Sequence, residues 1–222
     1  FLLIGVKSSV NSFEYRQAVR RAWANGVDNS DVCVYFLIGG VNATAVGGTQ
    51  KAKRLELALK NEQRVYNDLL LQPDLPVVDS YYTLVQKTSK FMKYAVANFN
   101  FDYLMICDDD VFVDVESLVR GLRASASRTR FYAGQVWEAQ YNRKIRPNRD
   151  TTHRNSLTKE EYPFEELPPF AIGPHFVVSY DCADFIGRNE AMLVGVGTLE
   201  DVTISFWLMS IGVRAEHVPW FN

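Results

Sequence analysis

The chain has few cysteines, no long apolar run and almost no net charge. Cys33, Cys107 and Cys182 have no paired spacing, which indicates neither a zinc site nor a disulfide framework, although one pair could be bridged in an oxidising compartment. The longest apolar runs, 34–38 and 103–107, are far shorter than the roughly 18–20 residues that cross a bilayer. A net charge of −2 provides no basic surface for nucleic acid or acidic membranes. We therefore expect a globular domain with no nucleic-acid partner.

What the chain does contain is ordinary for one soluble domain. Its 222 residues suffice for one sizeable core but not comfortably for two, so residues 1–222 are expected to form a single domain. Aromatic residues make up 13%, which suits a sugar-binding cleft and suits a generous core better. The sequence opens on the apolar stretch 1–6 without a methionine. We expect a domain trimmed at both ends, with any membrane anchor outside it.

Short apolar runs alternate with longer helical patterns, which predicts an α/β fold with a mostly parallel central sheet flanked by helices. The polar segment 138–162 has no clear periodicity, which is typical of a functional loop or lid. The expected strands are 2–6, 32–38, 76–79, 102–107, 131–137, part of 170–179 and one strand after the last helix. The expected helices are 12–24, 51–70, 83–97, 114–123 and 200–211.

Three consecutive carboxylates, Asp108, Asp109 and Asp110, follow the apolar strand 102–107. In an extended backbone, Asp108 and Asp110 point to one side and Asp109 to the other. Two carboxylates at a strand end suit a hard cation such as Mn²⁺ or Mg²⁺, with water and phosphate oxygens completing its shell. Ligands of open α/β sheets bind at such strand ends. The alternative is an acidic surface turn or helix N-terminus.

A second candidate is Asp201, at the start of the expected helix 200–211. Thr198 and Asp201 have the spacing of a capping box, and this alone could explain them. The functional interpretation makes Asp201 a general base that faces the cleft. In that position the helix dipole favours the ionised carboxylate, which predicts a low pKa and a weak base.

Arg16 and Arg20 lie four residues apart on the helix that follows the first strand. Guanidinium groups in this place could contact a diphosphate or a ribose. The alternative is an exposed, solvated helix face. The basic residues of 143–149 pose the same choice between a phosphate contact and a solvated loop.

Five ordered blocks together resemble the β-1,3-glycosyltransferase family, which includes β-1,3-galactosyltransferases, β-1,3-N-acetylglucosaminyltransferases and, more distantly, Fringe. The blocks span nearly the whole chain, and their order and spacing are more specific than any one of them. They are Arg16…Ala18-Val-Arg20…Trp23, Asp79-Ser-Tyr-Tyr-Thr-Leu-Val-Gln-Lys87-Thr88, Asp108-Asp-Asp-Val-Phe-Val113, Gly173…Val178-Ser179 and Leu199-Glu-Asp-Val202.

The resemblance implies a GT-A-like catalytic domain that depends on Mn²⁺ and inverts the anomeric carbon. It would move galactose or N-acetylglucosamine from UDP-galactose or UDP-N-acetylglucosamine to a hydroxyl of a glycan acceptor, in β-1,3 linkage. By position, Asp110 and Asp108 would hold the metal, Asp108 would also lie near the ribose, and Asp201 would be the catalytic base. Asp109, Arg16 and Arg20 are assigned to the nucleotide.

The resemblance also implies a lumenal catalytic domain of a Golgi membrane protein, acting on glycoprotein or glycolipid glycans. Two departures matter. The family's late metal-binding histidine is not matched by His217, which follows Asp201 after only 16 residues. The segment 170–175, Phe-Ala-Ile-Gly-Pro-His, stands where the family usually has Tyr-Cys-Ser-Gly-Gly-Gly, which puts the acceptor pocket in doubt.

Two other functions are compatible with parts of the pattern. One is a domain of the same fold that binds a nucleotide-sugar or a glycan and has lost turnover. The other is a metal-dependent phosphoester hydrolase built on the aspartate cluster. The hydrolase predicts further histidine or aspartate ligands at strand ends, which the sequence lacks.

Overall fold

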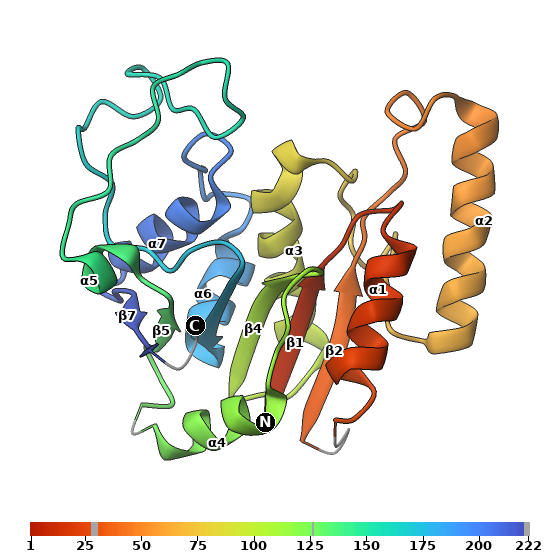
Figure 1. Ribbon diagram of the computed structural model, residues 1–222, viewed down its shortest axis with the longest axis horizontal. Helices are drawn as coiled ribbons and strands as arrows, with labels where there is room; N and C mark the ends of the chain where they lie inside the picture. The colour runs from red at the N-terminus through yellow and green to blue at the C-terminus, as the bar shows by residue number, and fades with distance from the viewer. Residues whose placement is uncertain (28–30, 126, 220–222) are drawn as a thin grey trace.

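The computed structural model describes residues 1–27, 31–125 and 127–219, and they fold around one seven-stranded sheet (Figure 1). The strand order is β3-β2-β1-β4-β6-β5-β7. Strands β3, β2, β1 and β4 run parallel, β6 is antiparallel to both of its neighbours, and β5 and β7 pair in parallel. The predicted α/β fold with a mostly parallel sheet is confirmed. The strands are β1 (Leu2–Lys7), β2 (Val32–Leu37), β3 (Leu69–Leu70), β4 (Tyr103–Asp108), β5 (Tyr132–Gly134), β6 (His175–Ser179) and β7 (Glu216–His217).

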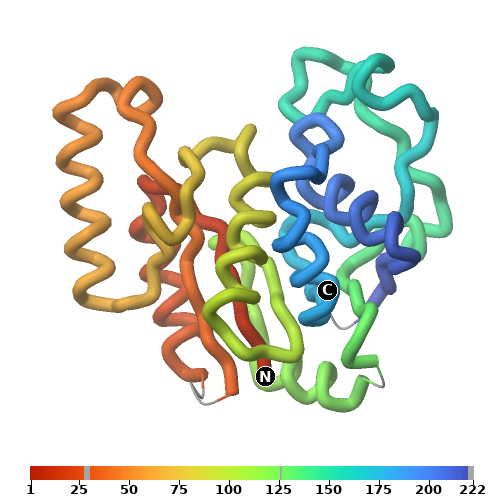
Figure 2. The backbone as a smooth tube through the Cα atoms, turned by 180° about the vertical axis from the view of Figure 1, so that it is seen from behind, coloured from red at the N-terminus to blue at the C-terminus, as the bar shows by residue number. Residues whose placement is uncertain are grey.

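Helices cover both faces of the sheet (Figures 1 and 2). One face packs against α1 (Phe13–Val19), its π-helical continuation η1 (Arg20–Ala24), α2 (Thr49–Tyr66) and α4 (Val115–Ala124). The other face packs against α3 (Leu84–Asn98), α6 (Tyr180–Asn189) and α7 (Glu200–Ser210). Two short helices, η2 (Tyr81–Thr83) and α5 (Trp137–Tyr141), complete the set in the described ranges.

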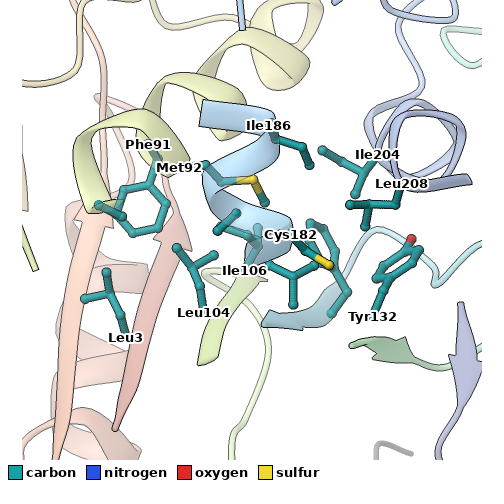
Figure 3. Close-up of a cluster of buried hydrophobic side chains, with 14 of the residues drawn as sticks. Leu3, Phe91, Met92, Leu104, Ile106, Tyr132, Cys182, Ile186, Ile204 and Leu208 are labelled. Carbon is teal, nitrogen blue, oxygen red and sulfur yellow. The ribbon is translucent and has the colours of Figure 1, made fainter. Parts of the chain in front are cut away.

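The strands read as apolar runs because both of their faces are buried. Ile4 and Met105 point to the α1 side, whereas Leu3 and Ile106 point to the α3 side. Figure 3 shows the second of these cores, where side chains of α3, α6 and α7 meet those of the sheet. The carboxyl ends of β1 and β4 are thereby fixed from both sides.

Three predicted elements differ from the structure. The helix expected over 51–70 ends at Tyr66, because Asn67 adopts a left-handed conformation with φ 53° and lets 69–70 turn back as β3. The expected strand 76–79 forms only an isolated bridge, Gly40 to Val78. The expected strand 131–137 is shorter because Trp137 begins α5. Helix α6 follows β6 directly and was not predicted from the sequence.

The segment 138–162 is mostly irregular beyond α5, as its lack of periodicity predicted. The Arg149 guanidinium fixes it by donating to the carbonyl oxygens of Leu157, Thr158 and Phe164. Beneath it lies a small separate core, made of Leu157, Tyr162, Leu167, Phe170, Ile172 and Val202. This loop is therefore a packed unit that covers the N-terminal turn of α7.

Two predictions from the sequence concern disulfides and membrane-spanning helices. No disulfide joins the three cysteines, all of which lie in the described ranges. Within the same ranges, none of the helices combines the length and the apolar character needed to span a bilayer.

Gly187 allows α6 to pack closely against α3. A Cβ at this position would lie 2.9 Å from the backbone N and Cα of Lys93, so a larger residue must push the two helices apart. We expect Gly187→Val to lower the free energy of unfolding by about 1–3 kcal/mol in urea titrations followed by circular dichroism. The control is Gly26→Val, because Gly26 is exposed and its Cβ would meet no atom within 4 Å. Equal losses in both variants would contradict this explanation.

Candidate functional site

Two neighbouring parallel strands end side by side at the carboxyl edge of the sheet. The pairing of β1 with β4 sets Lys7 opposite Asp108, and Lys7 Nζ lies 3.0 Å from Asp108 Oδ1. Ligands of open α/β sheets bind beyond such strand ends. The first of the three predicted aspartates therefore lies at the expected edge, held by a lysine that was not predicted as a site residue.

Lys7 joins two parts of the chain that are far apart in sequence. Besides Asp108, its ammonium group donates to Glu200 Oε2 at 2.6 Å and to the carbonyl oxygen of Gly173 at 3.0 Å. The other Glu200 carboxylate oxygen accepts a hydrogen bond from the Thr88 hydroxyl. Burial alone would lower the pKa of Lys7, but the two carboxylates raise it above its ordinary value, so the lysine stays charged. The only sequence signal for Lys7 was a charged residue closing an apolar strand.

The three aspartates share one pocket but differ in environment. Burial raises the pKa of Asp108 above its ordinary value, and Lys7 opposes that rise. Burial also raises the pKa of Asp109, and the neighbouring Ser8 and Ser12 hydroxyls oppose that rise. Asp110 is exposed. The pocket has a volume of about 310 Å³ and is also lined by Lys7, Ser8, Ser9, Ser12, Asp79, Ser80, Tyr81, Leu84 and Lys87.

The aspartates fit a cation that relies on few protein ligands. The strand ends at Asp108 and the chain turns at Asp109 and Asp110, so the predicted alternation along an extended backbone does not extend to Asp110. Across the described residues, no group of three or more His, Cys, Asp or Glu side chains is spaced to hold a metal. A cation such as Mg²⁺ needs only one or two carboxylates when substrate phosphates and water supply the rest. The buried Oδ2 of Asp109, without a hydrogen-bond partner in the described part of the chain, fits such a site.

Asp201 is the second residue of α7, directly after the Lys7-bound Glu200. Its Oδ2 accepts a hydrogen bond from the Gly173 amide at 3.1 Å, and its Oδ1 accepts one from Val202 at 2.9 Å. Burial raises the pKa of Asp201 to about 6, although both amides oppose the rise. The low pKa predicted from the helix dipole is therefore wrong, because desolvation outweighs the dipole here. A carboxylate with this pKa suits a general base near neutral pH.

The capping-box interpretation of Thr198 and Asp201 is not supported. The N-cap of α7 is Leu199, whose side chain forms no capping hydrogen bond. Thr198 Oγ1 instead donates to the carbonyl oxygen of Arg154, in the 138–162 loop, at 3.1 Å. Asp201 therefore does not act as a capping box with Thr198, although its Oδ1 accepts the Val202 amide in the first turn of α7.

The predicted contact of Arg16 and Arg20 with a nucleotide is not supported by their positions. Both side chains are only 1% exposed and face α2 rather than the pocket. Arg16 forms two hydrogen bonds with Glu62, and Arg20 pairs with Glu62 at 2.9 Å and with Asp68 at 2.7 Å. Arg16 Nη1 also donates to Ser8 Oγ and Ser9 O, so it supports the pocket wall indirectly. The exposed, solvated helix face that was the alternative is wrong, because both side chains are buried.

A second buried lysine fixes the loop after β1. Lys87 Nζ lies 2.6 Å from Asp79 Oδ1 and donates to the Ser8 carbonyl at 3.1 Å. Asp79 Oδ2 accepts from the Val10 amide at 2.9 Å. Both residues belong to one of the blocks that carry the family resemblance. They shape the pocket wall, and neither was predicted as a site residue.

His217, the late histidine of the sequence, has a structural contact. It lies in β7, where its Nδ1 accepts a hydrogen bond from the backbone N–H of Val136 at 3.2 Å. This bond ties the edge strand to the turn that follows β5.

Comparison with known proteins adds family evidence. The sequence pattern of the Galactosyltransferase family matches residues 14–219. Hydroxyproline O-galactosyltransferase GALT2 of Arabidopsis thaliana is 29% identical over 99% of this chain. Beta-1,3-galactosyltransferase GALT1 of the same plant is 31% identical over 95% of it. Beta-1,3-galactosyltransferase 1 of Mus musculus is 27% identical over the whole chain. The chain spans 30% of the length of both plant proteins and 64% of the mouse protein.

A solved structure supports the fold. The mannosyltransferase PcManGT from Pyrobaculum calidifontis, in complex with GDP-Man and Mn²⁺, superposes with a TM-score of 0.51. The match covers 99% of this chain and 55% of that protein, at 12% sequence identity. At this identity the likeness concerns the fold alone.

Proposed function

The chain belongs to the galactosyltransferase family, and from this premise we propose that it transfers a hexose from a UDP-sugar to an acceptor hydroxyl. Galactose is the first donor sugar to assay and N-acetylglucosamine the second. A glycan is the proposed acceptor, in β-1,3 linkage, and the names of the plant relatives add hydroxyproline as an acceptor to test. A lumenal Golgi location is proposed on the family resemblance.

One observation carries the proposal: Lys7 holds Asp108 and Glu200 together, and so places Asp201 beside the aspartate pocket. Three carboxylates that could receive a cation and its nucleotide thus lie near a carboxylate whose pKa of about 6 suits a base. We assign Asp110 and Asp108 to the metal, with Asp109 beside them. A bound Mn²⁺ would neutralise charge on the departing UDP.

In the proposed reaction, Asp201 accepts the proton of the acceptor hydroxyl. The resulting oxygen attacks the anomeric carbon, and the bond from that carbon to the β-phosphate oxygen of UDP breaks. The electron pair of that bond leaves with UDP. Attack opposite the leaving group inverts the anomeric configuration. The Gly173 amide orients the Asp201 carboxylate for this step.

The proposal is tested by calorimetric titration of UDP with and without Mn²⁺. The wild-type chain is expected to bind UDP in a metal-dependent manner, and Asp110→Ala to weaken that binding at least about 100-fold, since a direct metal ligand is lost. The control is Glu116→Ala, which removes an exposed carboxylate from α4 that pairs with Arg120. Metal-independent binding that Asp110→Ala leaves unchanged would overturn the metal assignment. Binding of UDP without any sugar transfer would mark a silent binding domain instead.

A further inference from the structure

The pocket contains more carboxylates than its own lysines can neutralise. Lys7 is committed to Asp108 and Glu200, and Lys87 to Asp79. A diphosphate that enters here would meet carboxylates, so beyond a metal it needs a cation that no carboxylate already holds.

Such a cation lies next to Tyr81, one of the residues that line the pocket. The guanidinium carbon of Arg154 lies 4.6 Å from the centre of the Tyr81 ring. Arg154 is exposed and forms no ion pair within the described ranges. Stacking uses the face of the guanidinium and leaves the N–H groups on its edge free to donate to a ligand.

The loop that carries Arg154 is fixed from two directions. The Tyr81 hydroxyl forms a hydrogen bond with Asn155 Oδ1. The carbonyl oxygen of Arg154 accepts from Thr198, two residues before Glu200, at 3.1 Å. The arginine is therefore attached to both the aspartate side and the Asp201 side of the site, unlike a solvated arginine on a free loop.

Electrostatics at Tyr81 support this placement. Burial raises the pKa of Tyr81 above its ordinary value. Arg154 and Lys7 oppose that rise, whereas Asp201 and Glu200 add to it. Tyr81 is thus within reach of the charges on both sides of the pocket, with Arg154 among them.

We propose that Arg154, held by stacking on Tyr81, binds the diphosphate of the donor nucleotide. The inference rests on the proposed function and adds to it a residue that the sequence analysis did not identify. Arginine donates in pairs to phosphate oxygens. When the bond to the anomeric carbon breaks, charge develops on the β-phosphate oxygen, where a fixed guanidinium stabilises it. Arg154 would then make the nucleotide contact that was predicted for Arg16 and Arg20.

The test uses Arg154→Gln and three ligands, namely UDP, UMP and uridine, titrated in Mn²⁺. We expect UDP to bind about 10–100-fold more weakly, as the loss of charge-assisted hydrogen bonds predicts. Binding of uridine, which has no phosphate, should stay within twofold of wild type, and UMP should lose less than UDP. Arg154→Lys should recover part of the lost UDP affinity. Tyr81→Leu, which removes the stacking ring, should weaken UDP binding more than Tyr81→Phe, which keeps it.

The matched control is Arg143→Gln. Arg143 comes from the same segment, and its guanidinium carbon lies 5.8 Å from the centre of the Tyr141 ring, but it lines a different pocket from the aspartates. Its loss should leave UDP affinity unchanged. The Arg154 assignment would be overturned if Arg154→Gln binds UDP with wild-type affinity, or if its affinities for UDP and uridine fall equally. The proposed function would stand in either case. A wild-type chain that binds no UDP in Mn²⁺ would overturn both.

Discussion

Asp201→Asn is expected to lower kcat for sugar transfer by about 10²–10⁴-fold, the usual contribution of a general base. Metal-dependent UDP binding should stay within about twofold of wild type. The asparagine oxygen can still accept the Gly173 amide hydrogen bond, whereas its NH2 group cannot accept the one from Val202, so the variant removes the base at the cost of one backbone hydrogen bond. Transfer is measured by UDP release at saturating donor and acceptor, with UDP affinity measured separately by calorimetry.

The pH dependence gives an independent test of the same residue. Burial raises the pKa of Asp201 to about 6, and a base must be deprotonated to act. Wild-type kcat/KM should therefore fall as pH decreases through about 6, and the residual activity of Asp201→Asn should lack that limb. Because the folded pKa lies above its ordinary value, ionising Asp201 costs folding free energy as pH rises toward 6, and the stability of the asparagine variant should lack this decrease with pH. Retained turnover, or lost UDP binding, would contradict the assignment.

Lys7→Met is expected to lower the free energy of unfolding by about 3–5 kcal/mol, because it leaves the buried Glu200 carboxylate without its counter-charge. The measurement is urea unfolding at pH 7, followed by circular dichroism. Of its side-chain hydrogen bonds within the described ranges, Glu200 would keep the one from Thr88. If the variant stays folded, UDP binding should weaken as well, since Asp108 loses its contact with Lys7.

Two further variants separate this effect from a general loss of charge. Lys7→Met combined with Glu200→Gln should be more stable than Lys7→Met alone, since the buried charge is then gone. Lys93→Met removes an exposed lysine that pairs with Glu190 at 3.1 Å and should cost less than about 1 kcal/mol. If Lys7→Met lowers the free energy of unfolding no more than Lys93→Met does, the contacts of Lys7 with Asp108 and Glu200 contribute little to stability.

Much of the fold could be predicted because its signals are local. Apolar runs with both faces buried mark β1, β2 and β4, and helical periodicity marks α3 and α4. The two-residue strand β3 could not be predicted this way, because it depends on pairing with β2 rather than on its own pattern. Helix α6 was missed because it follows β6 without a turn residue between them.

The site residues likewise divide into features that local sequence predicts and features that depend on tertiary contacts. The position of Asp108 at a strand end follows from local sequence, whereas its contact with Lys7 depends on the β1–β4 register. The spacing of Arg16 and Arg20 placed them correctly on one helix face. That they turn toward α2 depends on Glu62, a carboxylate more than 40 residues away along the chain. The pKa of Asp201 likewise depends on burial, which helix position alone does not predict.

The ion pairs of Lys7 with Asp108 and Glu200, here called the Lys7 junction, also constrain which substitutions the protein can accept during evolution. Its members lie at positions 7, 108 and 200, so no short segment holds the whole set. A substitution at position 7 that removes the positive charge would be tolerated mainly alongside a neutral residue at position 200. We therefore expect these two positions to covary among homologues. Exchanging only the N-terminal half with a relative that lacks the lysine should yield poorly folded chimaeras, whereas the same chimaera with the relative's residue at position 200 should fold.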